Sequence, residues 1–96
     1  MQGFHLNVLT TLPVRRRIIA LAIAGLWSRV PTELWTRWLR EAEIEERFPP
    51  PECCMENGLL ANIQLVAGFL GQSQDVVRQH FYRAKDVLAE VLKEME

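Results

Sequence analysis

Apolar residues recur at helical spacing in four segments of the chain. In the first segment a helix is predicted from about Leu12 to about Arg29, because Pro13 suits a first helical turn and apolar positions three and four residues apart follow it. The apolar face consists of Ile18, Ile19, Ala22, Ile23, Leu26 and Val30, widened by Leu21 and Trp27. A face this broad predicts a helix at the centre of the core.

The second segment begins at Pro31, which interrupts the first run and is tolerated at the start of a new helix. This helix is predicted to stop by Phe48, because residues 49–51 are three prolines that lack a backbone donor. Its apolar face consists of Leu34, Trp35, Trp38, Leu39 and Ala42. Together the first two segments predict a helical hairpin over residues 12–48, folded near Val30.

Two further helices are predicted after a proline-rich linker at residues 49–58. The third helix begins at Leu59 and ends at Gly71, a natural helix terminator. Its stripe is Leu59, Leu60, Ile63, Val66, Ala67 and Leu70. Ser73 suits the N-cap of the fourth helix, and Asp75 suits its positive first turn. This fourth helix is predicted to continue to the C-terminus, with Val77, His80, Phe81, Ala84, Leu88, Val91 and Leu92 in register.

No segment alternates as a strand does, so the sequence predicts one all-α domain over residues 1–96, with an N-terminal hairpin and a C-terminal helix pair at 59–95. Residues 1–11 are weakly patterned and predict either a tail or a short additional element. A length of 96 residues suits one domain, and the composition, 49% hydrophobic and 24% charged, is typical of a globular protein.

Composition also narrows the location and chemistry expected. The apolar run at 18–27 has ten residues, whereas a membrane span needs about twenty, so we expect a buried helix and no membrane partner, with a secretion signal as a lesser alternative. The adjacent Cys53 and Cys54 neither close a long loop nor have zinc-site spacing. A reducing cytoplasm and the absence of a metal ion are therefore expected.

Arginine and glutamate are unevenly distributed in the first half of the chain. Arg15, Arg16 and Arg17 fall in a first helical turn, where cations oppose the helix dipole. An antiparallel hairpin would bring them towards Glu43, Glu45 and Glu46. We therefore favour charge pairing within the chain over contact with nucleic acid.

Large apolar side chains offer two candidate interfaces. Trp27, Trp35 and Trp38 gather around the predicted hairpin turn, where core packing is the favoured interpretation. The apolar arc of the second helix is nevertheless broad, so Trp35 and Trp38 are also candidates for a partner surface. The end of the last helix could pair with a second copy through Val91, Leu92 and Met95.

The third and fourth helices have the proportions of a helix-turn-helix, with a break of three residues at 71–73. Such a corner needs a small residue in its first helix, a glycine in the turn and a hydrophobe early in its second helix. Ala67, Gly71 and Val77 stand at these positions. Residues 65–88, LVAGFLGQSQDVVRQHFYRAKDVL, resemble the helix-turn-helix of sigma-factor region 4 and of LuxR-type regulators.

The resemblance implies that Arg78, Gln79 and Tyr82 face a DNA groove. Helical geometry independently places them opposite the apolar stripe of the last helix. Arginine can bind guanine and glutamine adenine through paired hydrogen bonds, and Arg83 and Lys85 could reach phosphates. The sequence thus predicts a small DNA-binding or transcription-associated factor. The alternative is a non-enzymatic helical module that binds a protein partner, a second copy or a larger assembly.

Catalytic signatures are missing from the sequence. His80 lies on the inward stripe with nothing to form a triad, and we interpret it as a packed residue. No phosphate loop, nucleophile motif or cofactor fingerprint occurs. We therefore expect a non-enzymatic protein without cofactor or small-molecule substrate.

Overall fold

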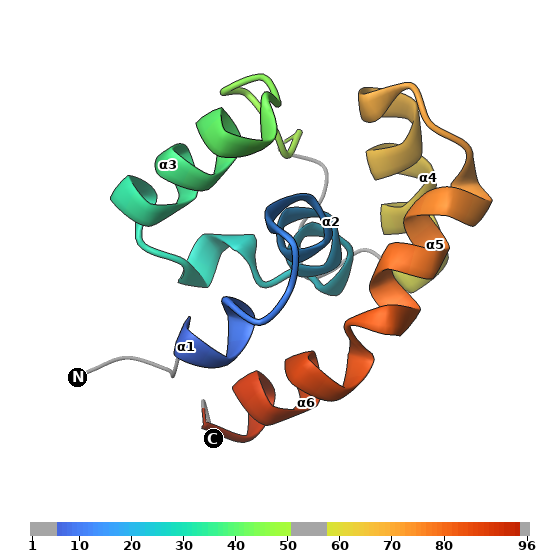
Figure 1. Ribbon diagram of the computed structural model, residues 1–96. Helices are drawn as coiled ribbons and strands as arrows, with labels where there is room; N and C mark the ends of the chain where they lie inside the picture. Colours follow the sequence, from blue (N-terminus) through green and yellow to red (C-terminus); the bar gives the residue numbers. More distant parts are fainter. Residues whose placement is uncertain (1–5, 51–57, 95–96) are drawn as a thin grey trace.

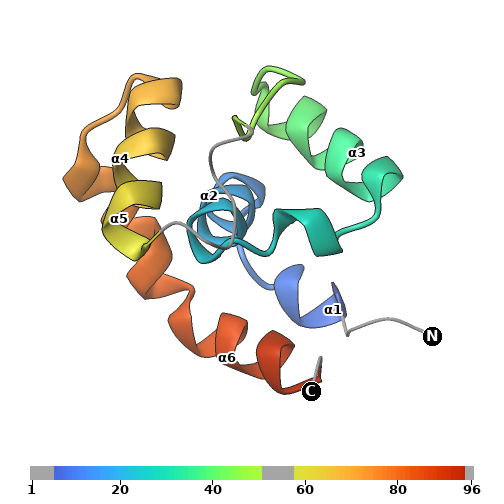
Figure 2. The ribbon, with the colours of Figure 1, turned by 180° about the vertical axis from the view of Figure 1, so that it is seen from behind.

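A computed structural model describes residues 6–50 and 58–94 of the chain. Within these residues every regular element is helical, which confirms the all-α prediction. The elements are α1 (Leu6–Leu9), α2 (Val14–Ala24), the 3-10 helix η1 (Trp27–Arg29), α3 (Thr32–Ala42), α4 (Leu59–Leu70), α5 (Gln74–Arg83) and α6 (Lys85–Glu94). Figures 1 and 2 show α2 at the centre, with α3 on one side of it, the α4 and α5 pair on the other, and α1 and α6 along one end.

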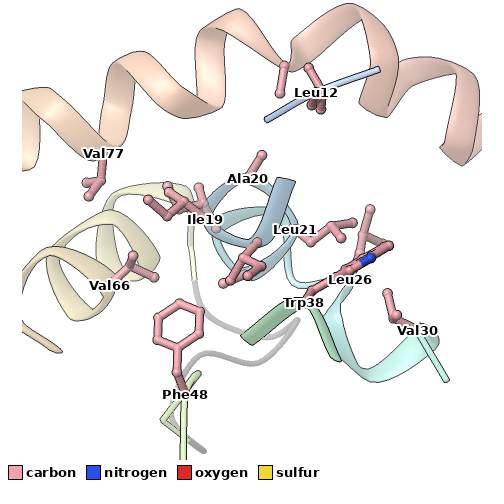
Figure 3. Close-up of a cluster of buried hydrophobic side chains, with 14 of the residues drawn as sticks. Leu12, Ile19, Ala20, Leu21, Leu26, Val30, Trp38, Phe48, Val66 and Val77 are labelled. Atoms are coloured by element: carbon pink, nitrogen blue, oxygen red, sulfur yellow. The ribbon is translucent and has the colours of Figure 1, made fainter. Parts of the chain in front are cut away.

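The core is built around α2, as its broad apolar face predicts. Residues 18–23 are at most 1% exposed, and α3, α4, α5 and α6 all pack against this helix. Figure 3 shows Ile19, Ala20 and Leu21 among side chains from the surrounding elements. Full burial of one large aliphatic side chain contributes about 1.5–3 kcal/mol, so α2 is a main source of the stability of the fold.

The C-terminal end of α2 lies earlier than predicted. Gly25 adopts the left-handed conformation (φ 75°), and its N–H bonds to the carbonyl of Ala22 at 3.1 Å. The N–H of Leu26 then bonds to the carbonyl of Leu21 at 2.9 Å, which completes a common helix-ending motif. The prediction of a helix to about Arg29 was wrong because Gly25 ends it, and the following residues form η1.

Helix α3 ends in the same way without a glycine. Glu43 adopts φ 58°, and the N–H of Ile44 bonds to the carbonyl of Leu39 at 2.9 Å. Buried Ile44 supplies the apolar contact that commonly accompanies this ending. The helix therefore stops at Ala42, six residues before the predicted limit at Phe48.

The start of α2 lies beside the end of α3, as a helical hairpin requires. Nη1 of Arg15 donates a hydrogen bond to the carbonyl of Ala42 at 3.3 Å. The predicted ion pairs from residues 15–17 to Glu43, Glu45 and Glu46 are wrong, since none of these described side chains come within 4.0 Å of each other; Glu45 instead pairs with Arg47 at 3.3 Å. Arg15 and Arg17 instead turn towards backbone carbonyls.

Arg17 shows this inward orientation most clearly. It is 9% exposed, and it donates from Nε to the carbonyl of Leu9 at 3.1 Å and from Nη2 to that of Leu12 at 2.8 Å. Its guanidinium also lies 4.8 Å from the centre of the Trp38 ring. Burial lowers the pKa of Arg17, an effect that the charge of Glu41 opposes. This one side chain therefore joins α1, α2 and α3.

Trp35 and Trp38 are part of the core, at 8% and 4% exposed. Nε1 of Trp35 donates to the carbonyl of Phe48 at 3.2 Å, and the two rings stack with centroids 6.5 Å apart. The Phe48 ring in turn lies 5.5 Å from that of Phe69 in α4. The assignment of Trp35 and Trp38 to a partner interface is therefore wrong, because both side chains are used inside the chain.

The last predicted helix is two helices, α5 and α6, that meet at Ala84. The N–H of Ala84 bonds to the carbonyl of Phe81 at 3.0 Å, a tighter closure than an α-helix uses, and after this bend α6 packs against α1. Leu88 and Val91 are buried by this turn, at 4% and 1% exposed. The predicted interface at Val91 is wrong for that reason. The Leu92 side chain and all of Met95 lie outside the described residues.

Candidate nucleic-acid interface

A turn of three residues joins α4 to α5, as the helix-turn-helix spacing predicts. Gly71 takes φ 67°, and the N–H of Gln72 bonds to the carbonyl of Ala67 at 3.0 Å, which closes α4. Oγ of Ser73 accepts a hydrogen bond from the N–H of Val76 at 3.2 Å. The glycine stop and the serine N-cap that the sequence predicts are both confirmed.

The inner side of this corner is closely packed. Ala67 in α4 is 3% exposed, and Val66 and Val77, from α4 and α5, are fully buried. Figure 3 shows Val66 and Val77 on the same side of α2 as Ile19. Because α4 and α5 contact each other and both contact α2, the corner is held by three helices.

Asn62 fixes α4 to the end of α2, a role that the sequence analysis missed. The side chain is 2% exposed, and its Nδ2 donates to the carbonyl of Ile23 at 2.9 Å. Carbonyls in the last turn of a helix lack a donor within the helix, so the amide supplies one. The available signal was a polar residue four positions before Val66, on the buried stripe of α4.

The outer side of α5 carries most of the residues predicted to contact DNA. Gln79, Tyr82 and Arg83 are exposed, with Tyr82 at 51%. Arg78 is half-buried and pairs with Asp75 one turn earlier, with Nη1 2.8 Å from Oδ1. The structure therefore brings these side chains together on one helix.

Lys85 belongs to a different element from the one predicted, since it is the first residue of α6. It is exposed, and its Nζ lies 5.7 Å from the centre of the Tyr82 ring. That distance allows a weak cation–π contact. The break at Ala84 thus leaves Lys85 next to the outer face of α5.

His80 lies on one flank of α5, half-buried, and its Nδ1 is buried without a hydrogen-bond partner among the described residues. Burial lowers the pKa of His80, and so do the positive charges of Arg16, Arg15 and Arg83. The packed core position expected from the sequence is met only in part, because His80 is half-buried and is not one of the buried core residues. The surrounding cluster of cations from α2 was not predicted.

Other candidate sites are less developed. A cavity of about 340 Å³ is lined by Trp27, Ser28, Val30, Thr32, Trp35, Glu46, Arg47, Phe48 and Pro49. Its charged lining residues are one acid, Glu46, and one base, Arg47. In the described ranges no three metal-binding side chains come together, and no helix is long and apolar enough to cross a bilayer. Cys53 and Cys54 lie outside those ranges.

Comparisons with models of known protein families, with characterised proteins and with solved structures give no match to this chain.

Proposed function

We propose that this chain is a small cytoplasmic DNA-binding factor associated with transcription, in which α4 and α5 form a helix-turn-helix and α5 enters the major groove. The observation that carries the proposal is the capped turn of three residues, which holds α5 against α4 and α2 while a polar face points outward. An α-helix with its side chains is about 10–12 Å across, and the major groove is about 12 Å wide, so a helix such as α5 fits the groove.

The outward side chains supply both kinds of contact that DNA recognition needs. Gln79 can bind an adenine edge through two hydrogen bonds, and Arg78 can bind a guanine edge. Asp75 restricts the Arg78 guanidinium, which lowers the entropy lost when it docks. Arg83 and Lys85 are both exposed and would contact phosphates beside the groove.

Selection from a randomised duplex pool tests this proposal. The intact chain should enrich a short sequence motif, and the double variant Arg78→Ala, Gln79→Ala should bind the selected duplex about tenfold or more weakly, because base contacts each contribute about 1–3 kcal/mol. The variant should stay folded, since Gln79 is exposed and an exposed ion pair contributes at most about 1 kcal/mol.

A double variant on α3 provides the matched control. Arg37 and Arg40 are exposed residues of α3, a helix that lies on the opposite side of α2 from α5 (Figure 1). Arg37→Ala, Arg40→Ala therefore removes more positive charge without changing the proposed interface. The control should bind the selected duplex with unchanged affinity and enrich the same motif. An equal loss of affinity in both double variants, or failure of the intact chain to enrich any motif, would contradict base recognition by α5.

A protein-interaction module is the second candidate, and the start of α4 favours it. Leu60 is 67% exposed and its neighbour Leu59 is 41% exposed, which leaves two large apolar side chains next to each other at the surface. Sedimentation equilibrium of the intact chain and of Leu60→Glu tests this. Self-association that Leu60→Glu abolishes would support the module, and a monomer at all concentrations would contradict self-association through this surface.

A further inference from the structure

Four basic residues gather where the start of α2 meets α5. Arg15 and Arg16 are half-buried in the first turn of α2, and α5, which packs against α2, contributes His80 and Arg83. All three arginines lie near enough to His80 for their charges to add to the effect of burial in lowering its pKa. We refer to these four residues as the basic patch.

The basic patch lacks a neutralising carboxylate among the described residues. The ion pairs among the described residues join Arg47 to Glu45 and Arg78 to Asp75, so none of them involves a patch residue. The first turn of α2 contains no acidic residue, and α4 has no ionisable side chain. Helix α6, which also packs against α5, carries Asp86 and Glu90, but neither forms an ion pair with a patch residue.

Several nitrogen atoms of the basic patch also lack a hydrogen-bond partner among the described residues. Arg15 donates to one carbonyl, that of Ala42, which satisfies a single N–H of its guanidinium. Nε of Arg16 is buried without a partner, and so is Nδ1 of His80. Positive charges at the start of a helix oppose its dipole, so this arrangement is unfavourable unless an anion neutralises it.

A phosphate group has the chemistry that this patch would bind. Guanidinium groups offer paired N–H donors in a planar fork that matches two phosphate oxygens. Arg83 follows Gln79 by four residues, so the two share one face of α5. A phosphate held by the patch would therefore lie beside the side chain proposed to read bases.

We propose that Arg15, Arg16 and Arg83 bind a phosphate of the DNA backbone and so fix how α5 sits in the groove. This inference rests on the proposed function and adds α2 to the DNA-binding surface. The contact carries no sequence information of its own, since backbone contacts position a protein and base contacts specify the site.

The salt dependence of DNA affinity tests the assignment. Loss of one phosphate contact should reduce the slope of log affinity against log salt by about 0.9, so Arg15→Gln, Arg16→Gln, which removes two of the three groups proposed to hold this phosphate, should reduce it by about 0.5 to 0.9. The loss should be similar for selected and random duplexes. Arg83→Gln is a second variant that leaves α2 unchanged, and Arg37→Gln, Arg40→Gln is the control with equal charge loss.

Proton NMR of the His80 imidazole separates failure of this inference from failure of the proposed function. A bound duplex should raise the His80 pKa, and Arg15→Gln, Arg16→Gln should reduce that rise. DNA binding with an unchanged salt slope in both patch variants would overturn the inference and leave the helix-turn-helix proposal standing. If no duplex binds, titration with inorganic phosphate tests whether the basic patch binds an anion. A change in the NMR shift of the His80 imidazole would support an anion site, and an unchanged shift would overturn it.

Discussion

The side-chain amide of Asn62 lies 2.9 Å from the carbonyl oxygen of Ile23 and joins α4 to the last turn of α2. Both groups are shielded from water, since Asn62 is 2% exposed and Ile23 is 1% exposed. The contact fixes the angle at which the α4 and α5 corner leaves the core. It is therefore part of what sets the position of α5 on the core.

Asn62→Ala is expected to destabilise the protein by about 2 kcal/mol, because it removes this hydrogen bond and leaves a buried carbonyl without its donor. Urea unfolding measures the change. Gln64→Ala, two residues away and exposed, is the control and should cost less than about 0.5 kcal/mol. Equal midpoints for the two variants would show that the Asn62 contact contributes nothing.

Ala67→Leu is expected to disrupt the packing between α4 and α5. Ala67 is 3% exposed in a corner closed by Val66 and Val77, and overpacking of this kind typically costs about 1–3 kcal/mol. Thermal unfolding provides the measurement, with Ala61→Leu, at an exposed position of the same helix, as the control. An unchanged melting temperature for Ala67→Leu would contradict the close approach of the two helices.

Glu43→Gly is expected to stabilise the protein by about 0.5–1 kcal/mol. Glu43 holds φ 58°, a conformation that costs an ordinary residue about 1 kcal/mol or more and costs glycine little, although glycine also loses more entropy on folding. Glu41→Gly makes the same substitution inside α3 and should destabilise by a similar amount. Urea midpoints that move in the same direction for both variants would refute the left-handed cap.

His80 should make stability depend on pH below neutrality. Burial, together with the charges of Arg16, Arg15 and Arg83, lowers its pKa from the ordinary 6.5, so the unfolded chain takes up the proton first as the pH falls. Its contribution to stability is therefore complete above about pH 7 and is lost as the pH falls through 6.5 towards the lower folded value.

Urea unfolding over that pH range, with His80→Gln, measures this contribution. The variant should lose part of the acid sensitivity, whereas His5→Gln, which removes the other histidine of the sequence, should retain the part that His80 causes. The same acid sensitivity in His80→Gln and in the unmodified chain would rule out His80 as a cause of the loss of stability at low pH.

The sequence predicts the α4 and α5 corner well because its signals are local. Gly71 and Ser73 end one helix and begin the next through their own backbone and side-chain chemistry, and both act as expected. Gly25 uses the same chemistry but lies within an unbroken apolar pattern, so the pattern concealed it. Local signals therefore predict a boundary only where the apolar periodicity also stops.

Other features depend on contacts between distant segments. Nothing near Ala84 in the sequence ends a helix, and the break there is explained by the burial of Leu88 and Val91 when α6 packs on α1. Arg17 turns inward because the carbonyls of α1 and the ring of Trp38 lie beside it. Sequence periodicity contains no information on such long-range partners.

DNA binding through α5 is tested most directly by fluorescence anisotropy of a labelled duplex over a salt series. The phosphate proposed for Arg15, Arg16 and Arg83, together with a second phosphate contacted by Lys85, should give a slope of log affinity against log salt of about −2. Arg78→Ala, Gln79→Ala should weaken binding to the selected duplex while keeping most of that slope. No binding at low salt, or a slope near zero, would contradict DNA recognition by this chain.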